Sequence, residues 1–111
     1  MLFRSLKEAQ DAALERLTVE WAKNGQQLSR ELEKHVLSSG SWATVMFLYQ
    51  EWDHRESSWR MPKARVVRYK FNRRLGEYQY KSKFVVSSPT QAKRIANQLT
   101  DWLPTQEASC A

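Results

Sequence analysis

The segment EYQYKSKFVV (77–86) alternates apolar and polar side chains with a period of two. Tyr78, Tyr80 and Phe84 fall on one side of such a segment, and Lys81 and Lys83 fall on the other. A period of two is typical of a strand with one buried face. The preceding four residues, RRLG (73–76), end in a glycine, which suits a tight hairpin loop. We therefore expect an antiparallel hairpin that pairs residues 59–72 with residues 77–86.

An earlier strand completes the expected sheet. The breaker SSGS (38–41) is followed by WATVMFLYQEW (42–52), which is rich in β-branched and aromatic residues. A polar turn, DHRESS (53–58), separates it from the second strand, which carries Pro62 near its start. We expect Trp52 to pair with Trp59 across this turn, and Phe71 to lie opposite Tyr78. The result is a three-stranded antiparallel β-meander.

The register of this meander decides which residues are free to bind a ligand, because a slip of one residue moves every side chain of a strand to the other face. The register that keeps Lys81 and Lys83 out of the core is favoured, since burying unpaired charge is costly. It places on the core face Trp42, Met46, Leu48, Val67, Tyr69, Phe71, Tyr78, Tyr80 and Phe84. It places on the outer face Phe47, Tyr49, Arg68, Lys70, Lys81 and Lys83.

The N-terminal part, residues 3–37, has the periodicity of a helix. Apolar residues at spacings of three, four and seven fall on one helical face. The stripe consists of Leu14, Leu17, Trp21, Leu28 and Leu32. Asn24-Gly25 interrupts it without changing its phase, so we favour one long, kinked helix over a helical hairpin. Such a helix is too long for the sheet to cover, so residues 1–38 are expected to mediate oligomerisation or docking, as a homodimer or higher oligomer.

The C-terminal part begins with SPTQ (88–91), which combines an N-cap serine, a proline at the first helical position and a glutamine at the third. Pro104 ends the helix. Residues 39–104 then form the sheet with its packed helix, and residues 105–111 a flexible tail. The expected fold class is α+β, with a long N-terminal helix, a three-stranded antiparallel meander and a C-terminal helix packed on the sheet.

The charge of the chain is concentrated in one segment. The net charge is +6, and residues 39–86, with ten basic and four acidic residues, account for all of it. Such polarisation is typical of proteins that bind nucleic acid. Cations would follow the phosphates while rings stack on bases, as in single-stranded DNA or RNA binding. The expected contacts are Arg68, Lys70, Lys81 and Lys83 on the sheet, Arg73 and Arg74 at the loop tip, and the rings of Phe47 and Tyr49.

Other interpretations of the same residues stay open. The outer face can be merely solvated, be covered by a helix, or bind a protein, and Arg73 and Arg74 can be ordinary loop residues. Trp52 and Trp59 can pack on each other, stack on bases or dock a protein. The alternative function is an oligomeric adaptor or structural subunit that binds a protein partner through the N-terminal helix. Binding to an anionic membrane ranks third.

No catalytic or metal-binding motif competes with these hypotheses. His35 and His54 belong to different expected elements, and Cys110 is the single cysteine. We therefore expect no enzyme activity, cofactor or metal. The chain shows no secretory signal and no apolar run near the roughly 18 residues of a membrane span, which favours a cytoplasmic or nucleoid-associated protein.

The meander followed by a capped helix, about residues 42–103 and including FVVSSPTQAKRIANQL (84–99), resembles the second half of the single-stranded-DNA-binding modules of the transcriptional coactivator family called positive cofactor four, and more distantly those of the Pur-alpha and whirly types. The resemblance implies a curved antiparallel sheet with a helix, copies usually paired through their helices, and single strands laid across the sheet. It assigns no role to an individual residue.

Overall fold

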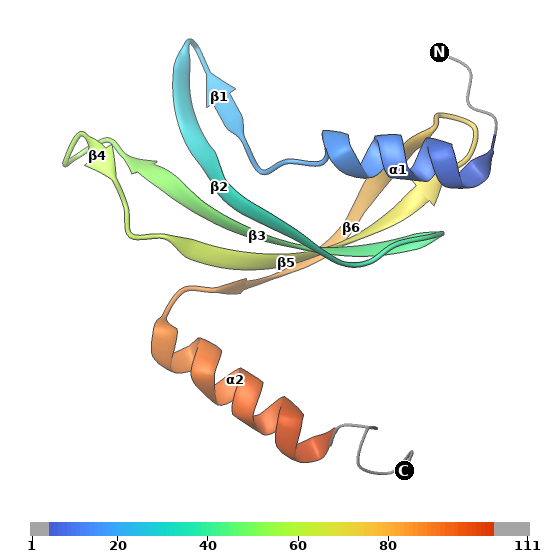
Figure 1. The fold of residues 1–111 in the computed structure, drawn as a ribbon. Helices are drawn as coiled ribbons and strands as arrows, with labels where there is room; N and C mark the ends of the chain where they lie inside the picture. The colour runs from blue at the N-terminus through green and yellow to red at the C-terminus, as the bar shows by residue number, and fades with distance from the viewer. Residues whose placement is uncertain (1–4, 104–111) are drawn as a thin grey trace.

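The structure, a computed structural model, describes residues 5–103. It is an α+β fold with two helices and one curved antiparallel sheet in the order β1-β2-β3-β5-β6, to which β4 is added by pairing with β3. The elements are α1 (Leu6–Arg16), β1 (Trp21–Lys23), β2 (Gln26–Ser38), β3 (Trp42–Asp53), β4 (Ser58–Trp59), β5 (Lys63–Asn72), β6 (Glu77–Val86) and α2 (Pro89–Trp102). Figure 1 shows that the sheet curls around α1, while α2 projects from its convex side. The predicted fold class is wrong in its strand number, because the sheet has six strands rather than three.

The predicted N-terminal helix over residues 1–38 is also wrong. The helix α1 ends at Arg16, and the chain continues as the hairpin of β1 and β2. Asn24 and Gly25 form its turn, with φ angles of +52° and +79°. Two successive positive φ angles are what a two-residue hairpin turn requires, and a helix does not contain them. The Asn-Gly pair is therefore a hairpin signal rather than a kink.

The predicted oligomerisation stripe does not exist as one face. Leu14 is buried on α1, and Leu17, just after this helix, packs against the same core. Trp21 lies on β1 and is 59% exposed, whereas Leu28 and Leu32 lie on β2. The spacing is compatible with both a helix and a pair of strands, and the turn at Asn24-Gly25 selects the strands.

Two of the predicted strand pairings are confirmed. Trp52 pairs with Trp59, and Phe71 pairs with Tyr78 beside the four-residue turn 73–76. Between these places, however, the predicted register slips by one residue. Arg60 still bonds to Glu51, but Tyr49 pairs with Lys63, so the segment around Pro62 contains one residue more than a continuous strand allows. The slip exchanges the two faces of β3.

A second irregularity lies on β6, where Tyr69 pairs with Tyr80 but Arg68 pairs with Ser82. The extra residue is Lys81, and it forms a β-bulge that reverses the alternation beyond it. Phe84 therefore shares a face with Val66 and is 53% exposed, although the pattern of the sequence placed it in the core.

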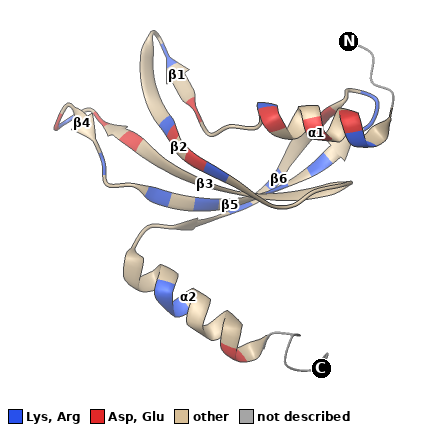
Figure 2. Ribbon diagram, in the orientation of Figure 1, with Lys and Arg blue, Asp and Glu red and all other residues tan. Residues whose placement is uncertain are grey.

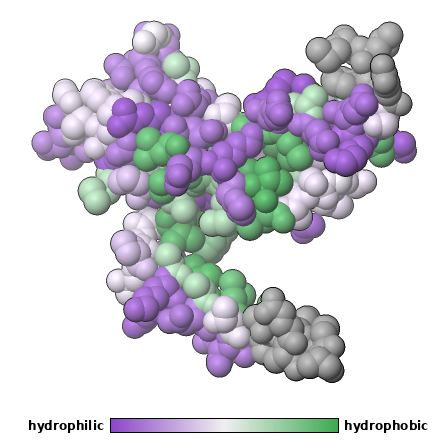
Figure 3. All heavy atoms as spheres, viewed as in Figure 1, coloured by the Kyte–Doolittle hydropathy of each residue, from purple (hydrophilic) through white to green (hydrophobic). Residues whose placement is uncertain are grey.

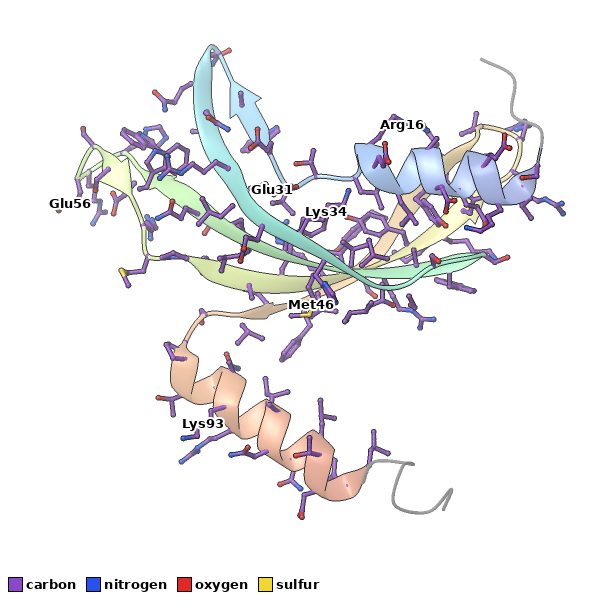
Figure 4. All side chains as sticks on the ribbon, in the orientation of Figure 1. Arg16, Glu31, Lys34, Met46, Glu56 and Lys93 are labelled. Atoms are coloured by element: carbon purple, nitrogen blue, oxygen red, sulfur yellow. The ribbon has the colours of Figure 1, made fainter. Side chains whose placement is uncertain are left out.

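The core lies on the concave side of the sheet, beneath α1. It is built from β3, β5, β6 and α1 together with Val19, and it consists of Ala13, Leu14, Val19, Ala43, Val45, Phe47, Tyr49, Val67, Tyr69, Phe71 and Tyr78. The hydroxyl of Tyr78 donates to the carbonyl of Gly40 at 2.6 Å, whereas burial raises the pKa of Tyr69 to about 12. Lys34 of β2 donates to the carbonyls of Leu14 and Leu17 and so fixes the end of α1 over the sheet, as the labelled side chain shows in Figure 4.

The helix α2 begins as predicted, with the hydroxyl of Ser88 accepting from the backbone N–H of Gln91 at 3.0 Å. The prediction that it packs on the sheet is wrong, because none of its residues is buried. Leu99 and Trp102 are 47% and 70% exposed. The predicted tail, residues 105–111, and Cys110 within it lie outside the described residues.

Candidate nucleic-acid interface

Trp42, Arg68 and Lys70 form a cluster on the convex face of the sheet, called here the Trp42 cluster. Trp42 of β3 pairs with Lys70 of β5, and Arg68 lies two residues before Lys70 on the same face. The Arg68 guanidinium and the Lys70 ammonium lie 4.7 and 5.2 Å from the centre of the indole ring. Both distances are typical of cation–π contacts. The indole is 42% exposed, so the cluster presents a ring with two cations at the surface.

The turn between β5 and β6 carries two further cations, Arg73 and Arg74, and both are exposed. The turn is well defined, because the side-chain oxygen of Asn72 accepts from the N–H of Leu75 at 3.0 Å and Gly76 adopts a φ of +67°. Arg73 and Arg74 therefore stand on a defined turn near the strand end that contains Lys70.

The predicted lysines of β6 do not lie with Arg68 and Lys70. Lys83 pairs with Val67, so the register places it on the concave side, and Lys81 is the bulge residue. Both are exposed along β6, which is an edge strand. The six predicted cations thus surround the β5–β6 hairpin instead of lining one face.

The predicted stacking rings are wrong. Phe47 and Tyr49 are each 1% exposed, because the register of β3 turns them into the core. The ring of Tyr49 is covered by Arg65, whose guanidinium lies 4.3 Å from the ring centre. The ring that the prediction missed is Trp42. The prediction placed Trp42 in the core because it missed the extra residue near Pro62. That proline was the signal in the sequence for a break in the strand.

The cations of the β5–β6 hairpin differ from those at the other end of the sheet in having few acids near them in the sequence and no ion-pair partner within the described residues. The segment from Val66 to Phe84 contains one acid, Glu77. It contains six cations, which are Arg68, Lys70, Arg73, Arg74, Lys81 and Lys83. None of these six forms an ion pair within residues 5–103. At the far end, Lys63 contacts Glu51 at 2.5 Å and Arg60 contacts Asp53 at 3.8 Å. Figure 2 shows the basic residues along β5 and β6 and the mixed charges elsewhere.

Trp52 and Trp59 pack on each other, which was one of the interpretations left open. Their ring centres are 5.3 Å apart in an edge-to-face arrangement, and the guanidinium of Arg30 lies 4.3 Å from the centre of the Trp59 ring. Such pairs stabilise a strand pairing.

The part of the chain that the structure describes contains no group of three His, Cys, Asp or Glu residues that could hold a metal ion. His54 is exposed in the turn between β3 and β4, and His35 pairs with Met46 on β3, so the two imidazoles belong to separate places. Neither described helix combines the length and the apolar character needed to cross a membrane.

Comparison with protein-family models, curated proteins and solved structures gave no match to this chain.

Proposed function

We propose that the protein binds single-stranded DNA or RNA, without enzymatic activity, through the β5–β6 hairpin and the Trp42 cluster. The observation that carries this proposal is the exposed indole of Trp42 with the cations of Arg68 and Lys70 beside it. Aromatic rings stack on bases of any sequence, while cations beside them follow the phosphates. The six cations around this hairpin, which form no ion pair within residues 5–103, supply the positive field that attracts a polyanion.

The geometry favours single strands over a duplex. Trp42 offers a flat ring at the surface, and a base must be unstacked from its neighbours before it can use such a ring. In a duplex the bases remain stacked inside, so binding would depend on the cations alone. We therefore expect the protein to bind single strands more tightly than a duplex, and we expect this preference to depend on Trp42.

A titration of the full chain with a fluorescently labelled oligonucleotide tests the proposal. Single-stranded oligonucleotides should bind more tightly than the matching duplex, and the affinity should fall steeply between 50 and 200 mM salt, because each phosphate contact releases counterions. Affinity that does not change with salt, or no preference for single strands, would contradict the proposed mechanism.

A second candidate is the pairing of two copies, for which the free helix α2 is the specific observation. The prediction assigned this role to a long helix over residues 1–38, but α1 ends at Arg16 and the predicted stripe does not form one face. Figure 3 shows hydrophobic residues on the side of α2 that is turned towards the sheet and on the convex side of the sheet itself. The residues concerned are Ile95, Leu99, Trp102 and Leu103 on the helix side and Met46, Leu48, Val66 and Phe84 on the sheet.

A second copy of the chain can cover both surfaces, because its α2 can pack on this sheet while its sheet receives this α2. In a symmetric pair each α2 lies against the other chain, so both apolar surfaces are covered at once. A standard interface buries about 800 Å² per partner, and one fully buried aromatic side chain contributes about 150–250 Å². Trp102 and Phe84, with Leu99 and Leu103, are about half or more exposed, so they would supply a large part of this area. The Trp42 cluster adjoins this area, because Arg68 lies two residues from Val66 on the same face of β5.

Light scattering coupled to size-exclusion chromatography tests this candidate. The full chain should elute with twice the monomer mass of 13.1 kDa, and Leu99→Asp should convert it to a monomer. Leu75→Asp, which changes an equally exposed leucine in the β5–β6 turn, is the matched control and should remain paired. A monomeric wild-type chain would exclude the pairing while leaving the nucleic-acid proposal standing.

A further inference from the structure

Thr44, Arg68 and Ser82 lie side by side across three neighbouring strands, on the convex face of the sheet. Thr44 of β3 pairs with Arg68 of β5, and Arg68 pairs in turn with Ser82 of β6. Directly opposite residues of antiparallel strands place their side chains on the same face, with Cβ atoms about 4.5–5.5 Å apart. The three residues therefore form one row across the sheet, called here the Thr44 row. A hollow of about 210 Å³ is lined by all three of them, together with Val66, Lys83 and Phe84.

The polar groups of the Thr44 row are free to bind a ligand. Arg68 and Ser82 are exposed, and Thr44 is partly buried. None of the three side chains makes a hydrogen bond or an ion pair within residues 5–103. The contact with the indole of Trp42, 4.7 Å from the ring centre, holds the Arg68 guanidinium in place. The row thus presents a positioned guanidinium with a hydroxyl on each side of it.

The rows on either side of the Thr44 row contain no acid. One row consists of Trp42, Lys70 and Gln79, and the other of Met46, Val66 and Phe84. The nearest acids on the strands of this face are Glu77 on β6 and Glu33 on β2, and each pairs with a residue four positions from the row, which is about 13 Å along a strand. The helix α2 has a single acid, Asp101, near its C-terminal end. The charge of Arg68 is therefore available for an anion.

A phosphodiester backbone suits this row better than a small carboxylate does. Arginine and the hydroxyls of serine and threonine are usual donors to phosphate oxygens in complexes with nucleic acids. The three donors lie in line across two spacings between strands, or about 10 Å. A small carboxylate is too short to use both hydroxyls, whereas a polymer with repeated phosphates extends along the whole row. Trp42 lies one row away on the same face, where a base of the same polymer can stack.

We propose that the sugar–phosphate backbone of a bound single strand follows the Thr44 row across β3, β5 and β6, while a base stacks on Trp42. The guanidinium of Arg68 donates to a phosphate oxygen, and the hydroxyls of Thr44 and Ser82 donate to phosphate oxygens on either side. This inference rests on the proposed function. It adds two uncharged contacts to that function, and it gives the bound strand a direction, because the strand crosses the β-strands instead of running along one of them.

Thr44→Val and Ser82→Ala test the row, since each removes one hydroxyl and no charge. The measurement is a fluorescence-anisotropy titration of the full chain with a labelled oligothymidine of about ten nucleotides, a length within the range of single-strand sites. Each variant should bind at least about threefold more weakly than the wild type, because it loses a hydrogen bond to a charged phosphate. Ser58→Ala, at an exposed position of β4 at the far end of the sheet, is the matched control and should bind like the wild type.

The salt dependence separates the hydroxyls from the guanidinium. Thr44→Val and Ser82→Ala remove no cation, so the slope of log affinity against log salt should stay that of the wild type. Arg68→Gln should weaken binding and lower the magnitude of this slope by about one, because one phosphate is no longer neutralised. An unchanged slope in Arg68→Gln would show that Arg68 contacts no phosphate, and it would overturn the proposal.

A strand with neutral methylphosphonate linkages identifies the group that the hydroxyls contact. The factor lost through Ser82→Ala should be smaller on this strand than on the natural one, because its linkages carry no charge and accept weaker hydrogen bonds. An equal loss on both strands would show that the hydroxyl contacts a base or a sugar, and it would also overturn the proposal.

Two results distinguish the Thr44 row from the proposed function. If the wild-type chain binds single strands with a steep salt dependence while both hydroxyl variants bind equally well, the row has no role and the proposed function stands. A wild-type chain that does not bind single strands contradicts the proposed function itself. Should Thr44→Val disturb the central strand β3, the exposed Ser82 on the edge strand β6 decides through Ser82→Ala alone.

Discussion

Trp42 and Lys70 face each other across β3 and β5, and the ammonium of Lys70 lies 5.2 Å from the centre of the indole ring. This pair fixes the register of the two strands and the faces of both. With Trp42 beside Lys70, the even-numbered residues of β3 are turned to the convex side, and Phe47 and Tyr49 are turned into the core. The same register brings the guanidinium of Arg68 to the indole ring of Trp42, where it forms the second cation–π contact.

The first prediction concerns Trp42. Trp42→Leu should lower the affinity for a single-stranded oligonucleotide by about fivefold or more, since one base–ring stack contributes about 1–3 kcal/mol. The affinity for a duplex should change little. A fluorescence-anisotropy titration measures both. Trp21→Leu is the matched control, because Trp21 is also exposed but lies on β1, at the other end of the sheet. An equal loss for both variants would show that Trp42 has no special role.

The hairpin of β5 and β6 could be predicted from the sequence, because the alternation of its apolar and polar residues and its glycine-ended turn are local signals. The register of β3 was not, because it depends on a single extra residue around Pro62 that changes no local pattern. A difference of one residue moved Phe47 and Tyr49 from the expected binding face to the core. The bulge at Lys81 acted in the same way on Phe84. Strand existence is thus a local property, whereas the assignment of faces depends on pairing geometry.

The candidate site could be predicted in part, because some of its features are also local. The concentration of cations in residues 39–86 needs only counting, and the structure places Arg68, Lys70, Arg73 and Arg74 near one end of the sheet. The ring beside them could not be chosen without the register. The β1–β2 hairpin was missed because its apolar spacing also fits a helix, although Asn24-Gly25 is the strongest short hairpin signal in the chain.

The second prediction tests the assignment of the two faces. Phe47→Ala should destabilise the protein by about 3–5 kcal/mol, because it leaves a cavity in a closed core. Phe84→Ala, at a half-exposed position, should cost less than about 1 kcal/mol. Urea unfolding at low protein concentration measures both, and the slopes of the transitions should be similar. The opposite order of the two effects would restore the predicted register and contradict the structure.

The third prediction concerns Lys34, which donates to the carbonyls of Leu14 and Leu17 at the end of α1. Lys34→Met keeps most of the side-chain stem but removes the donor, and it should lower the free energy of unfolding by about 1–2 kcal/mol. Lys93→Met on the exposed helix α2 is the matched control and should be nearly neutral. Hydrogen exchange locates the effect, since α1 should exchange faster while β5 and β6 do not. A uniform change along the chain would argue against this role.

The fourth prediction follows from Glu51 and Lys63. The hydrogen bond from the Lys63 ammonium lowers the pKa of Glu51 below its ordinary value of 4.5, although partial burial acts in the opposite direction. A pKa that is lower in the folded state means that the ionised carboxylate stabilises the fold. This contribution is present above pH 4.5 and is lost as the pH falls through the lower folded pKa.

Glu51→Gln should therefore reduce stability near neutral pH and have little effect once the pH is well below 4.5. The side chain of Glu51 is 41% exposed, so solvent screening limits the effect to about 0.2–1 kcal/mol. Urea unfolding at several pH values measures it. Glu56→Gln, in the exposed turn after β3, is the matched control and should show no such pH dependence, because no cation contacts its carboxylate within residues 5–103. Lys63→Met should give the same loss at neutral pH, and the two substitutions together should cost less than the sum of their separate effects. Additive losses, or a Glu51→Gln effect that does not change with pH, would show that the contact between Lys63 and Glu51 does not stabilise the fold.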